Sequence, residues 1–448
     1  MTHHATLPVP GPGQWAAGDA PPPDAGRQDD GQGGPLPRLM PARPAPAGLT
    51  EHLTRFGAPP YRGAPRRLIG DVEAAGLTGR GGAAFPTHRK LAAMAAGRGP
   101  APVVIGNGAE GEPASSKDKS LLWYSPHLVL DGLQLAAEAV GSATVGLYIH
   151  RNPRLYERLQ AAIAERAAAG LDAARVELIE APHRFLAGEE SALAGRISGG
   201  PALPRFKPPR ASQRGVAGRR TLVQNVETLA HLALIARYGP GWFRSAGTPD
   251  EPGSMLATLH QADGRMGVVE TALGTPIAEL LRLPAQAVLV GGYHGAWLPG
   301  AQAELLPLTN AALRPLGAAV GAGVLAALPA DRCGLAETAR VVRYLALESA
   351  GQCGPCFNGL PRIAGALAEL AGPRPRPQVQ ADLQRWSGLV AGRGACHHPD
   401  GTVRLVRSAL QVFAAEIGHH AHGYCTGTTS RPFLPLPAEP PLDDTDWT

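Results

Sequence analysis

The chain has 448 residues, 44% of them hydrophobic and 18% charged, which is enough to form roughly two to four domains. The net charge of +5 is mild, and no run of Lys or Arg concentrates it, so we exclude a nucleic-acid-binding protein. No stretch reaches about 18 uninterrupted apolar residues, and the N-terminus lacks a signal-peptide core. We therefore expect a cytoplasmic protein without direct membrane insertion.

The two ends of the chain differ in composition from the rest. Residues 1–47 are dominated by Pro, Gly, Ala and Asp, which cannot form a packed core, and we expect a disordered segment. Residues 426–448 form a tail that is Pro-rich and then acidic.

Strand and helix patterns alternate over residues 48–247, where short apolar runs predict buried strands and apolar residues at helical spacing predict helices. Such an alternation implies a parallel sheet with crossover helices, which is an α/β domain. The predicted strands are Val103–Ile105, Ala143–Ile149 and Val176–Ile179, and the predicted helices are Thr50–Phe56, Pro126–Val140, Pro153–Ala168 and Val226–Tyr238.

The pattern changes after residue 247, where short strands and one short helix predict a small α+β module over residues 248–330. Its segments are the strands Met255–Leu259, Val268–Thr271 and Val288–Gly291 and the helix Pro276–Leu283. Four amphipathic segments with short connections then predict an all-α bundle over residues 331–425. They are Leu335–Leu347, Pro361–Leu370, Val379–Val390 and Val403–Ile417.

A glycine-rich loop, Gly79–Pro86, is the first candidate for ligand binding. It nearly matches G-x-G-x-x-G, but the helix-like segment Leu68–Ala75 precedes it where a Rossmann fingerprint requires a strand. Glycines still allow backbone N–H groups to converge on a phosphate, and Lys90 adds a positive charge nearby. The alternative is a plain flexible loop.

Polar segments follow the predicted strands or open the next helix, namely Asn107–Pro113, Gly188–Ser191 and Val223–Thr228. The C-terminal ends of parallel strands are where open α/β sheets bind ligands. Each segment alone is explained by a solvated loop or by carboxylates that stabilise a helix N-terminus. Together, at the ends of one sheet, they predict a shared nucleotide site.

The cysteines favour a metal centre over structural disulfides, because Cys353 and Cys356 form a C-x2-C pair in an expected cytosolic protein. Cys396 follows after a long gap. Iron–sulfur clusters take thiolate ligands, and zinc is the main alternative, with His397 and His398 as further ligands.

The other two cysteines are interpreted separately. Cys333 lies near a helix start and is interpreted as a small buried hydrophobe. Cys425 follows His419, His420 and His422, a cluster that either binds a metal or forms an exposed polar helix end.

These motifs occur together and in this order in one family. From about Leu49 to Cys425 the chain resembles the flavin- and NADH-binding subunit of respiratory complex I (the 51-kDa type), shared with NAD-linked hydrogenases and formate dehydrogenases. GRGGAAFPTHRK is similar to GRGGAGFPTGxK, and NGAEGEPASSKDK to NADExEPGTFKDR. AGEESAL is similar to CGEETAL, VQNVETLA to VNNVETLA, and ESAGQCGPC to ESCGxCxPC.

The resemblance implies a Rossmann-like FMN domain, a β-grasp module of the SLBB type and a four-helix Fe–S domain, matching the three blocks. It implies an oxidoreductase in which NADH reduces FMN and electrons leave singly through a [4Fe–4S] cluster. The redox partner would be a membrane-bound reductase or a small Fe–S subunit, and it could hold the protein at the inner face of a membrane. The alternatives are an FMN/Fe–S carrier that no longer uses NADH, and a non-catalytic ligand-binding scaffold.

Residue roles follow from the matched motifs. The catalytic candidates Glu112 and Glu190 would face the ribose or nicotinamide of NADH, and Phe85 would stack on adenine. Cys353, Cys356 and Cys396 would ligate the cluster. FMN would be held by Gly79, Arg80, Gly81, Gly82, Lys90, Asn107, Glu110, Gly188, Glu189, Asn225 and Thr228.

The chain departs from the family at several positions. Ala350 replaces the first cluster ligand, so we expect a three-cysteine cluster, either [3Fe–4S] or [4Fe–4S] with a non-cysteine ligand, or no cluster. The candidate substitutes are His397, His398, Cys333 and Cys425. In the nucleotide site, the departures are His88, Ala93, Ala109, Phe185 and Arg210.

Overall fold

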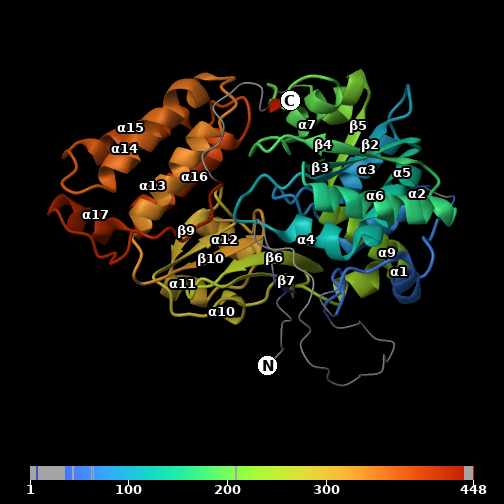
Figure 1. The fold of residues 1–448 in the computed structure, drawn as a ribbon, viewed down its shortest axis with the longest axis horizontal. Helices are drawn as coiled ribbons and strands as arrows, with labels where there is room; N and C mark the ends of the chain where they lie inside the picture. Colours follow the sequence, from blue (N-terminus) through green and yellow to red (C-terminus); the bar gives the residue numbers. More distant parts are fainter. Residues whose placement is uncertain are drawn as a thin grey trace.

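The computed structural model describes residues 7–8, 36–42, 45–61, 63, 65–206, 209–437 and 447–448. Most of the segment expected to be disordered, residues 1–47, lies outside this range, as does part of the tail at residues 438–446. Figure 1 shows three neighbouring parts, with a helical layer at the left, one sheet at the upper right and a second sheet below. No helix among the described residues is long and apolar enough to cross a membrane.

The first sheet is parallel throughout and has the strand order β4-β3-β2-β5. The predicted α/β alternation is therefore confirmed, although β5 was not predicted as a strand. Asn107 pairs with Asn225 in the register of β2 and β5, which brings two of the predicted polar segments together. The strands are β2 (Val103–Gly108), β3 (Thr144–His150), β4 (Val176–Ala181) and β5 (Thr221–Asn225).

Helices cover this sheet, and the three predicted to start at Pro126, Pro153 and Val226 begin at those residues, the last extending to Arg244 beyond its predicted end at Tyr238. Crossover helices α5 (Pro126–Val140) and α6 (Pro153–Ala168) have the predicted bounds, because each has a proline in its first turn. Helix α5 packs against α9 (Val226–Arg244) so closely that a Cβ at Gly132 would lie 1.9 Å from the Leu229 carbonyl oxygen. The other helices of this part are α1 (Leu49–Phe56), α2 (Pro65–Ala75), α3 (Thr87–Ala95), α4 (Lys117–Tyr124), α7 (Glu190–Ile197) and α8 (Ala211–Arg214).

The second sheet has the order β1-β7-β6-β10-β8-β9, and its one parallel pair is β6 with β10. The three predicted strands are confirmed, and the predicted helix Pro276–Leu283 is a single turn, α10 (Ile277–Leu280). The strands are β1 (Leu7–Pro8), β6 (Ser254–His260), β7 (Met266–Ala272), β8 (Ala287–Val290), β9 (Ala296–Pro299) and β10 (Val324–Leu328). Two short helices, α11 (Gly300–Glu304) and α12 (Asn310–Leu313), lie between β9 and β10.

The helical layer follows the prediction except at its end. The last predicted helix, Val403–Ile417, begins earlier and is divided at Phe413 into α16 and α17. Helix α13 packs against α14 and α16, while α16 also packs against β9 and so joins the layer to the second sheet. The bounds are α13 (Gly334–Leu347), α14 (Leu360–Leu370), α15 (Val379–Val390), α16 (His398–Val412) and α17 (Ala414–Ala421).

Candidate functional site

A cleft of about 720 Å³ opens where the three parts of the chain meet. Its walls come from the glycine-rich loop, the ends of β2 and β5, the start of α7, the turn after β8 and the start of α16. Most of the predicted site residues line it, including both catalytic candidates and one predicted cluster ligand. These are Gly79, Gly81, Gly82, Phe85, Lys90, Asn107, Glu112, Gly188, Glu189, Glu190, Asn225, Thr228 and Cys396.

The glycine-rich loop is a closed turn between α2 and α3. The Gly79 N–H donates to the carbonyl of Phe85 at 2.9 Å, and a bridge joins Thr78 to Pro86. Gly82 has φ +101°, a conformation in which side chains are strained, so this position requires glycine. Ala84 has φ +50° where the similar family motif has glycine.

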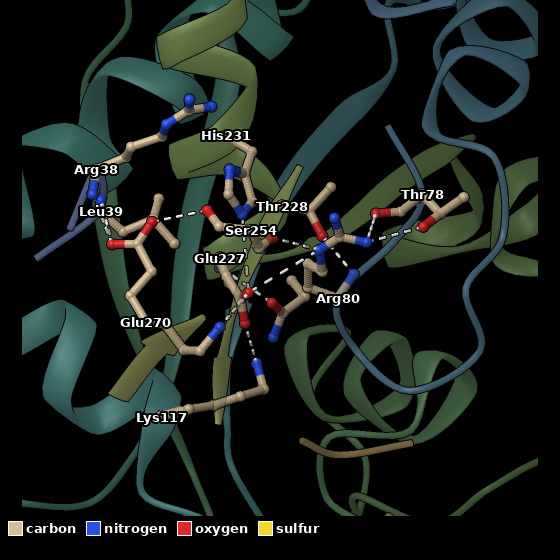
Figure 2. A network of polar contacts seen from close by, with 12 residues as sticks. Arg38, Leu39, Thr78, Arg80, Lys117, Glu227, Thr228, His231, Ser254 and Glu270 are labelled. Atoms are coloured by element: carbon tan, nitrogen blue, oxygen red, sulfur yellow. Dashed lines mark hydrogen bonds and ion pairs between the residues drawn. The ribbon is translucent and has the colours of Figure 1, made fainter. Parts of the chain in front are cut away.

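The Arg80 side chain points away from the cleft, so this residue does not line the site predicted for it. Its guanidinium donates to the Thr78 hydroxyl at 2.9 Å and to the Ser254 carbonyl at 3.3 Å, and it lies 4.0 Å from Glu227 (Figure 2). Burial lowers the pKa of Arg80. The backbone N–H of Arg80 donates to the Thr228 hydroxyl at 2.9 Å, which attaches the loop to the start of α9.

A buried ionic network lies behind the loop. Lys117 Nζ lies 2.9 Å from Glu227 Oε2 and 2.7 Å from Asp118 Oδ1, and Asp118 accepts a hydrogen bond from the Asn225 side-chain amide at 2.7 Å. Burial raises the pKa of Glu227, but Lys117, His231 and Arg80 outweigh burial and lower it to about 2. The network therefore holds a charged carboxylate beneath the cleft and fixes the start of α9.

Asn107 joins the two acidic loops. Its side-chain amide donates to the Gly188 carbonyl at 2.8 Å, and its oxygen accepts from the Ala109 N–H at 3.2 Å. A Cβ at Gly188 would lie 2.6 Å from the Ala109 carbonyl oxygen, and one at Gly111 would lie 2.3 Å from that of Phe185. The two loops thus pack backbone against backbone, which requires glycine at both positions.

Glu110 does not line the cleft. Its buried carboxylate accepts from the N–H groups of Asp118 and Lys119 at 3.3 and 3.2 Å and from the Ser115 hydroxyl. It therefore satisfies the first N–H groups of α4. Together with Arg80, it is a predicted FMN-binding residue that the structure places in the support of the cleft.

The three remaining acidic residues line the cleft but differ in their partners. Glu189 caps α7, accepting from the N–H groups of Ser191 and Ala192 at 2.8 and 3.2 Å. Glu112 accepts from the N–H of Tyr293 at 2.9 Å, and burial raises its pKa to about 7. Within the described part of the chain, the Glu190 carboxylate makes no hydrogen bond or ion pair and is available to a ligand.

The second sheet supplies a wall of the cleft that the sequence did not predict. The turn after β8 places His294 in the cleft, where its ring lies 4.8 Å from that of Phe185. The glycines before His294, at the end of a predicted strand, were the one sequence feature that could have indicated this wall of the cleft. The other lining residues from this part are Gly291, Gly295, Ala319, Gly321 and Ala322.

The predicted cluster ligands lie next to this cleft. Cys396 lines it and packs in one apolar group with Ala350 and Leu186. Burial, with the neighbouring thiols of Cys353 and Cys396, raises the pKa of Cys356 to about 12. A nearby metal charge would favour the thiolate instead. The three cysteines and the alanine therefore lie together, as the family motif implies.

Three of the four candidate substitutes for the missing ligand are engaged elsewhere. His398 uses both ring nitrogens, accepting from His294 at 3.0 Å and donating to the Leu345 carbonyl at 2.8 Å. Cys333 precedes α13, whereas Ala350 follows its other end, and 14 helical residues span about 21 Å. Cys425 lies with Cys333. His397 remains, with an exposed side chain at the edge of the cleft.

Comparisons with known proteins agree with this arrangement. The Nuo51 FMN-binding domain family matches residues 72–234, and the NADH-ubiquinone oxidoreductase-F iron-sulfur binding region matches residues 336–420. The chain is 28% identical to the second F-type subunit of NADH-quinone oxidoreductase in Rhizobium meliloti (strain 1021), covering 80% of this chain and 89% of that protein. It is also 28% identical to the F-type subunit of Streptomyces coelicolor (strain ATCC BAA-471 / A3(2) / M145), covering 80% of this chain and 84% of that protein.

A solved structure is similar over most of the fold. An NAD+-reducing [NiFe]-hydrogenase in the air-oxidised state superposes with a TM-score of 0.72 and 28% identity, over 83% of this chain and 64% of the hydrogenase chain. An NAD+-reducing [NiFe]-hydrogenase in the H2-reduced state superposes with a TM-score of 0.72 and 26% identity. The FMN-binding match precedes the iron–sulfur match on this chain. The chain therefore contains a region that matches the Nuo51 FMN-binding domain family and one that matches the F-type iron–sulfur binding region, and over about 80% of its length it is similar to F-type subunits of NADH-quinone oxidoreductase.

Proposed function

We propose that the chain is the NADH-oxidising, FMN-binding subunit of a larger redox assembly, and that it passes electrons singly through an Fe–S cluster. The observation that carries this proposal is the position of Cys396. This residue lines the same cleft as the glycine-rich loop and the two catalytic candidates. A flavin in this cleft and a cluster on Cys353, Cys356 and Cys396 would be neighbours.

The residues of the cleft fit FMN. Gly82 leaves the loop surface without a side chain, and Lys90 lines the cleft with its ammonium 3.3 Å from the Val223 carbonyl, where it can balance a phosphate. When bound, FMN accepts a hydride, that is two electrons, and releases the electrons one at a time. Lys90 and the loop N–H groups would bind and orient it.

The acidic residues fit a second, transient ligand. Glu190 offers a carboxylate to ribose hydroxyls, and Phe85, 39% exposed at the rim, offers a ring face to adenine. Glu112 would hold or release a proton beside the nicotinamide, since its pKa is about 7. In each turnover NADH becomes NAD+, and both electrons leave through the cysteine site.

The remaining parts have proposed roles too. We assign residues 48–247 to the FMN domain, 248–330 to an SLBB-type β-grasp module and 331–425 to the helical Fe–S domain. A redox partner would dock beside the cluster, where Phe206 and Phe357 are each 75% exposed and Phe206 shares a hollow with Cys353. A membrane-bound partner would hold the chain at a membrane surface.

The test is anaerobic reduction of the purified protein. Flavin and Fe–S absorbance are recorded, and NADH is then added. Bleaching of the flavin supports the proposal, whereas a flavin that only dithionite reduces favours an electron carrier that no longer uses NADH. A colourless protein after cofactor reconstitution favours a ligand-binding scaffold. A Cys396→Ser variant is the matched control, because it should keep flavin reduction and lose the Fe–S signals.

A further inference from the structure

A group of side chains of the types that ligate metals lies around α17, outside the cleft described above. Cys333, Glu416, His420 and Cys425 place their ligand atoms all within 4.8 Å of one another. Among the described residues, no other group of three or more His, Cys, Asp or Glu side chains meets this distance. The first three residues are buried and Cys425 is exposed.

Three separate segments converge to form the group. Cys333 is the N-cap of α13, Glu416 and His420 lie one turn apart on α17, and Cys425 follows that helix. The Thr428 N–H donates to the Asp331 carbonyl at 3.0 Å, which ties the last segment to the first. A Cβ at residue 427 would lie 2.7 Å from the Cys333 nitrogen, so glycine there permits the close approach.

The ligand atoms already point toward one another. His420 Nε2 lies 3.6 Å from Cys333 Sγ and 3.1 Å from Glu416 Oε1. Two thiolates on one tetrahedral zinc ion lie roughly 3.8 Å apart, given Zn–S bonds of about 2.3 Å. Atoms within 4.8 Å of one another therefore need movements of only about 1 Å to surround one ion.

Outer contacts orient two of the ligands. His420 Nδ1 lies 3.2 Å from the Leu370 carbonyl, to which its N–H donates, and this leaves the Nε2 lone pair directed at the group. Glu416 accepts from the Thr426 N–H at 2.8 Å, and His419 Nδ1 lies 3.2 Å from its other oxygen. A backbone carbonyl on the second nitrogen is the usual support of a metal-binding histidine.

We propose that Cys333, Glu416, His420 and Cys425 form a structural site for a divalent metal ion of the zinc class. Two thiolates, one imidazole and one carboxylate give the mixed soft and borderline ligands that zinc takes, and four protein ligands leave no open position for catalysis. Binding releases the two thiol protons to solvent. The ion holds α17 and the segment after it on the start of α13. This site is additional to the Fe–S cluster and does not depend on the proposed redox function.

The experiment measures metal content in the full-length holoprotein, purified without oxygen from cells supplied with zinc. Elemental analysis should give about one zinc per chain beyond the iron, and zinc-edge X-ray absorption should report two sulfur and two nitrogen or oxygen neighbours. Cys425→Ser and His420→Asn should lose the zinc while iron and flavin contents stay unchanged. Cys425→Ser is the milder change, because this thiol is exposed.

Two matched variants separate the sites. His422→Asn, on a nearby side chain whose Nδ1 lies 2.8 Å from the Gly418 carbonyl, should keep the zinc. Cys356→Ser should lose iron and keep the zinc. The proposal is overturned if the wild-type protein holds iron and flavin but no zinc, or if Cys356→Ser removes the zinc and Cys425→Ser does not. A Cys333–Cys425 disulfide in the anaerobic protein would overturn it as well. If the variants do not fold, the X-ray absorption of the wild-type protein decides.

Discussion

Lys117 and Glu227 form an ion pair directly behind the glycine-rich loop, with Nζ 2.9 Å from Oε2 and both side chains almost fully buried (Figure 2). The pair connects the start of α4 to the start of α9, and Arg80 lies on the other side of the same carboxylate. Removing one partner of such a pair leaves a buried charge without compensation. The pair therefore supports the wall of the cleft on which the ligand would rest.

We expect Lys117→Met to lower the free energy of unfolding by about 3–5 kcal/mol and to weaken flavin retention. The loss comes from the carboxylates of Glu227 and Asp118, which keep no buried ammonium partner. Chemical denaturation followed by circular dichroism measures it. Lys119→Met is the control, because Lys119 is 40% exposed and lies 3.9 Å from Glu110, and it should cost less than about 1 kcal/mol. Equal losses in both variants would contradict the assigned role.

Ala350→Cys should supply the missing thiolate. Ala350 is buried in the same apolar group as Cys396, and its backbone hydrogen-bonds to the Cys356 thiol. We expect more iron per chain and a change in the EPR spectrum toward that of a four-thiolate [4Fe–4S] cluster. Ser349→Cys places a thiol one residue before the replaced ligand position, outside the C-x2-C-x2-C spacing, and it should change neither the iron content nor the EPR spectrum. An unchanged spectrum in Ala350→Cys would mean that another group already occupies the fourth position.

Local signals predicted much of the fold. Helices α5 and α6 begin at Pro126 and Pro153, and α5 ends before Gly141, whose φ of +68° stops a helix. Helix α4 was not predicted, because six of its eight residues are buried, the charged Lys117 and Asp118 among them, which removes the amphipathic pattern. Strands β9 and β10 are short and buried almost throughout, so they lack the alternation that marks a strand.

The candidate site was predicted in its residues but not in their orientations. Each polar motif was recognisable because it sits at a strand or helix end, and the structure brings these ends together. The sequence could not show that Arg80 and Glu110 face away from the cleft, because their partners Ser254 and Asp118 become neighbours only after folding. His294 was missed for the same reason, since it comes from the second sheet.

Glu112 should make stability depend on pH near neutrality. Its pKa is raised from 4.5 to about 7, so the folded protein binds a proton there that the unfolded chain has lost. This contribution is complete below pH 4.5 and disappears as the pH rises through about 7. Glu112→Gln cannot titrate and still accepts from the Tyr293 N–H. The stability of the wild-type protein relative to Glu112→Gln should therefore fall by about 1–3 kcal/mol between pH 5 and pH 8, as thermal unfolding can measure. A constant difference, or one that rises with pH, would contradict the raised pKa.

Glu190 should contribute to NADH binding and little to folding. Because its carboxylate has no partner among the described residues, a Glu190→Gln change removes no internal contact. A lost charged hydrogen bond to a ribose hydroxyl is worth about 1.5–3 kcal/mol, so the KM for NADH should rise roughly 10- to 100-fold. Flavin content and thermal stability should not change. Steady-state kinetics with a soluble electron acceptor gives KM, and flavin absorbance gives the cofactor content.

The neighbouring carboxylate provides the contrast. Glu189 caps α7 through the N–H groups of Ser191 and Ala192, so Glu189→Ala should cost about 1 kcal/mol of stability. The two variants should therefore differ: Glu190→Gln should raise the KM for NADH, whereas Glu189→Ala should lower the stability of the fold. A stability loss without a kinetic effect in Glu190→Gln would remove this residue from the NADH site. The cleft would then have to recognise the ribose through Glu112, whose carboxylate already accepts hydrogen bonds from Tyr293 and Ala114.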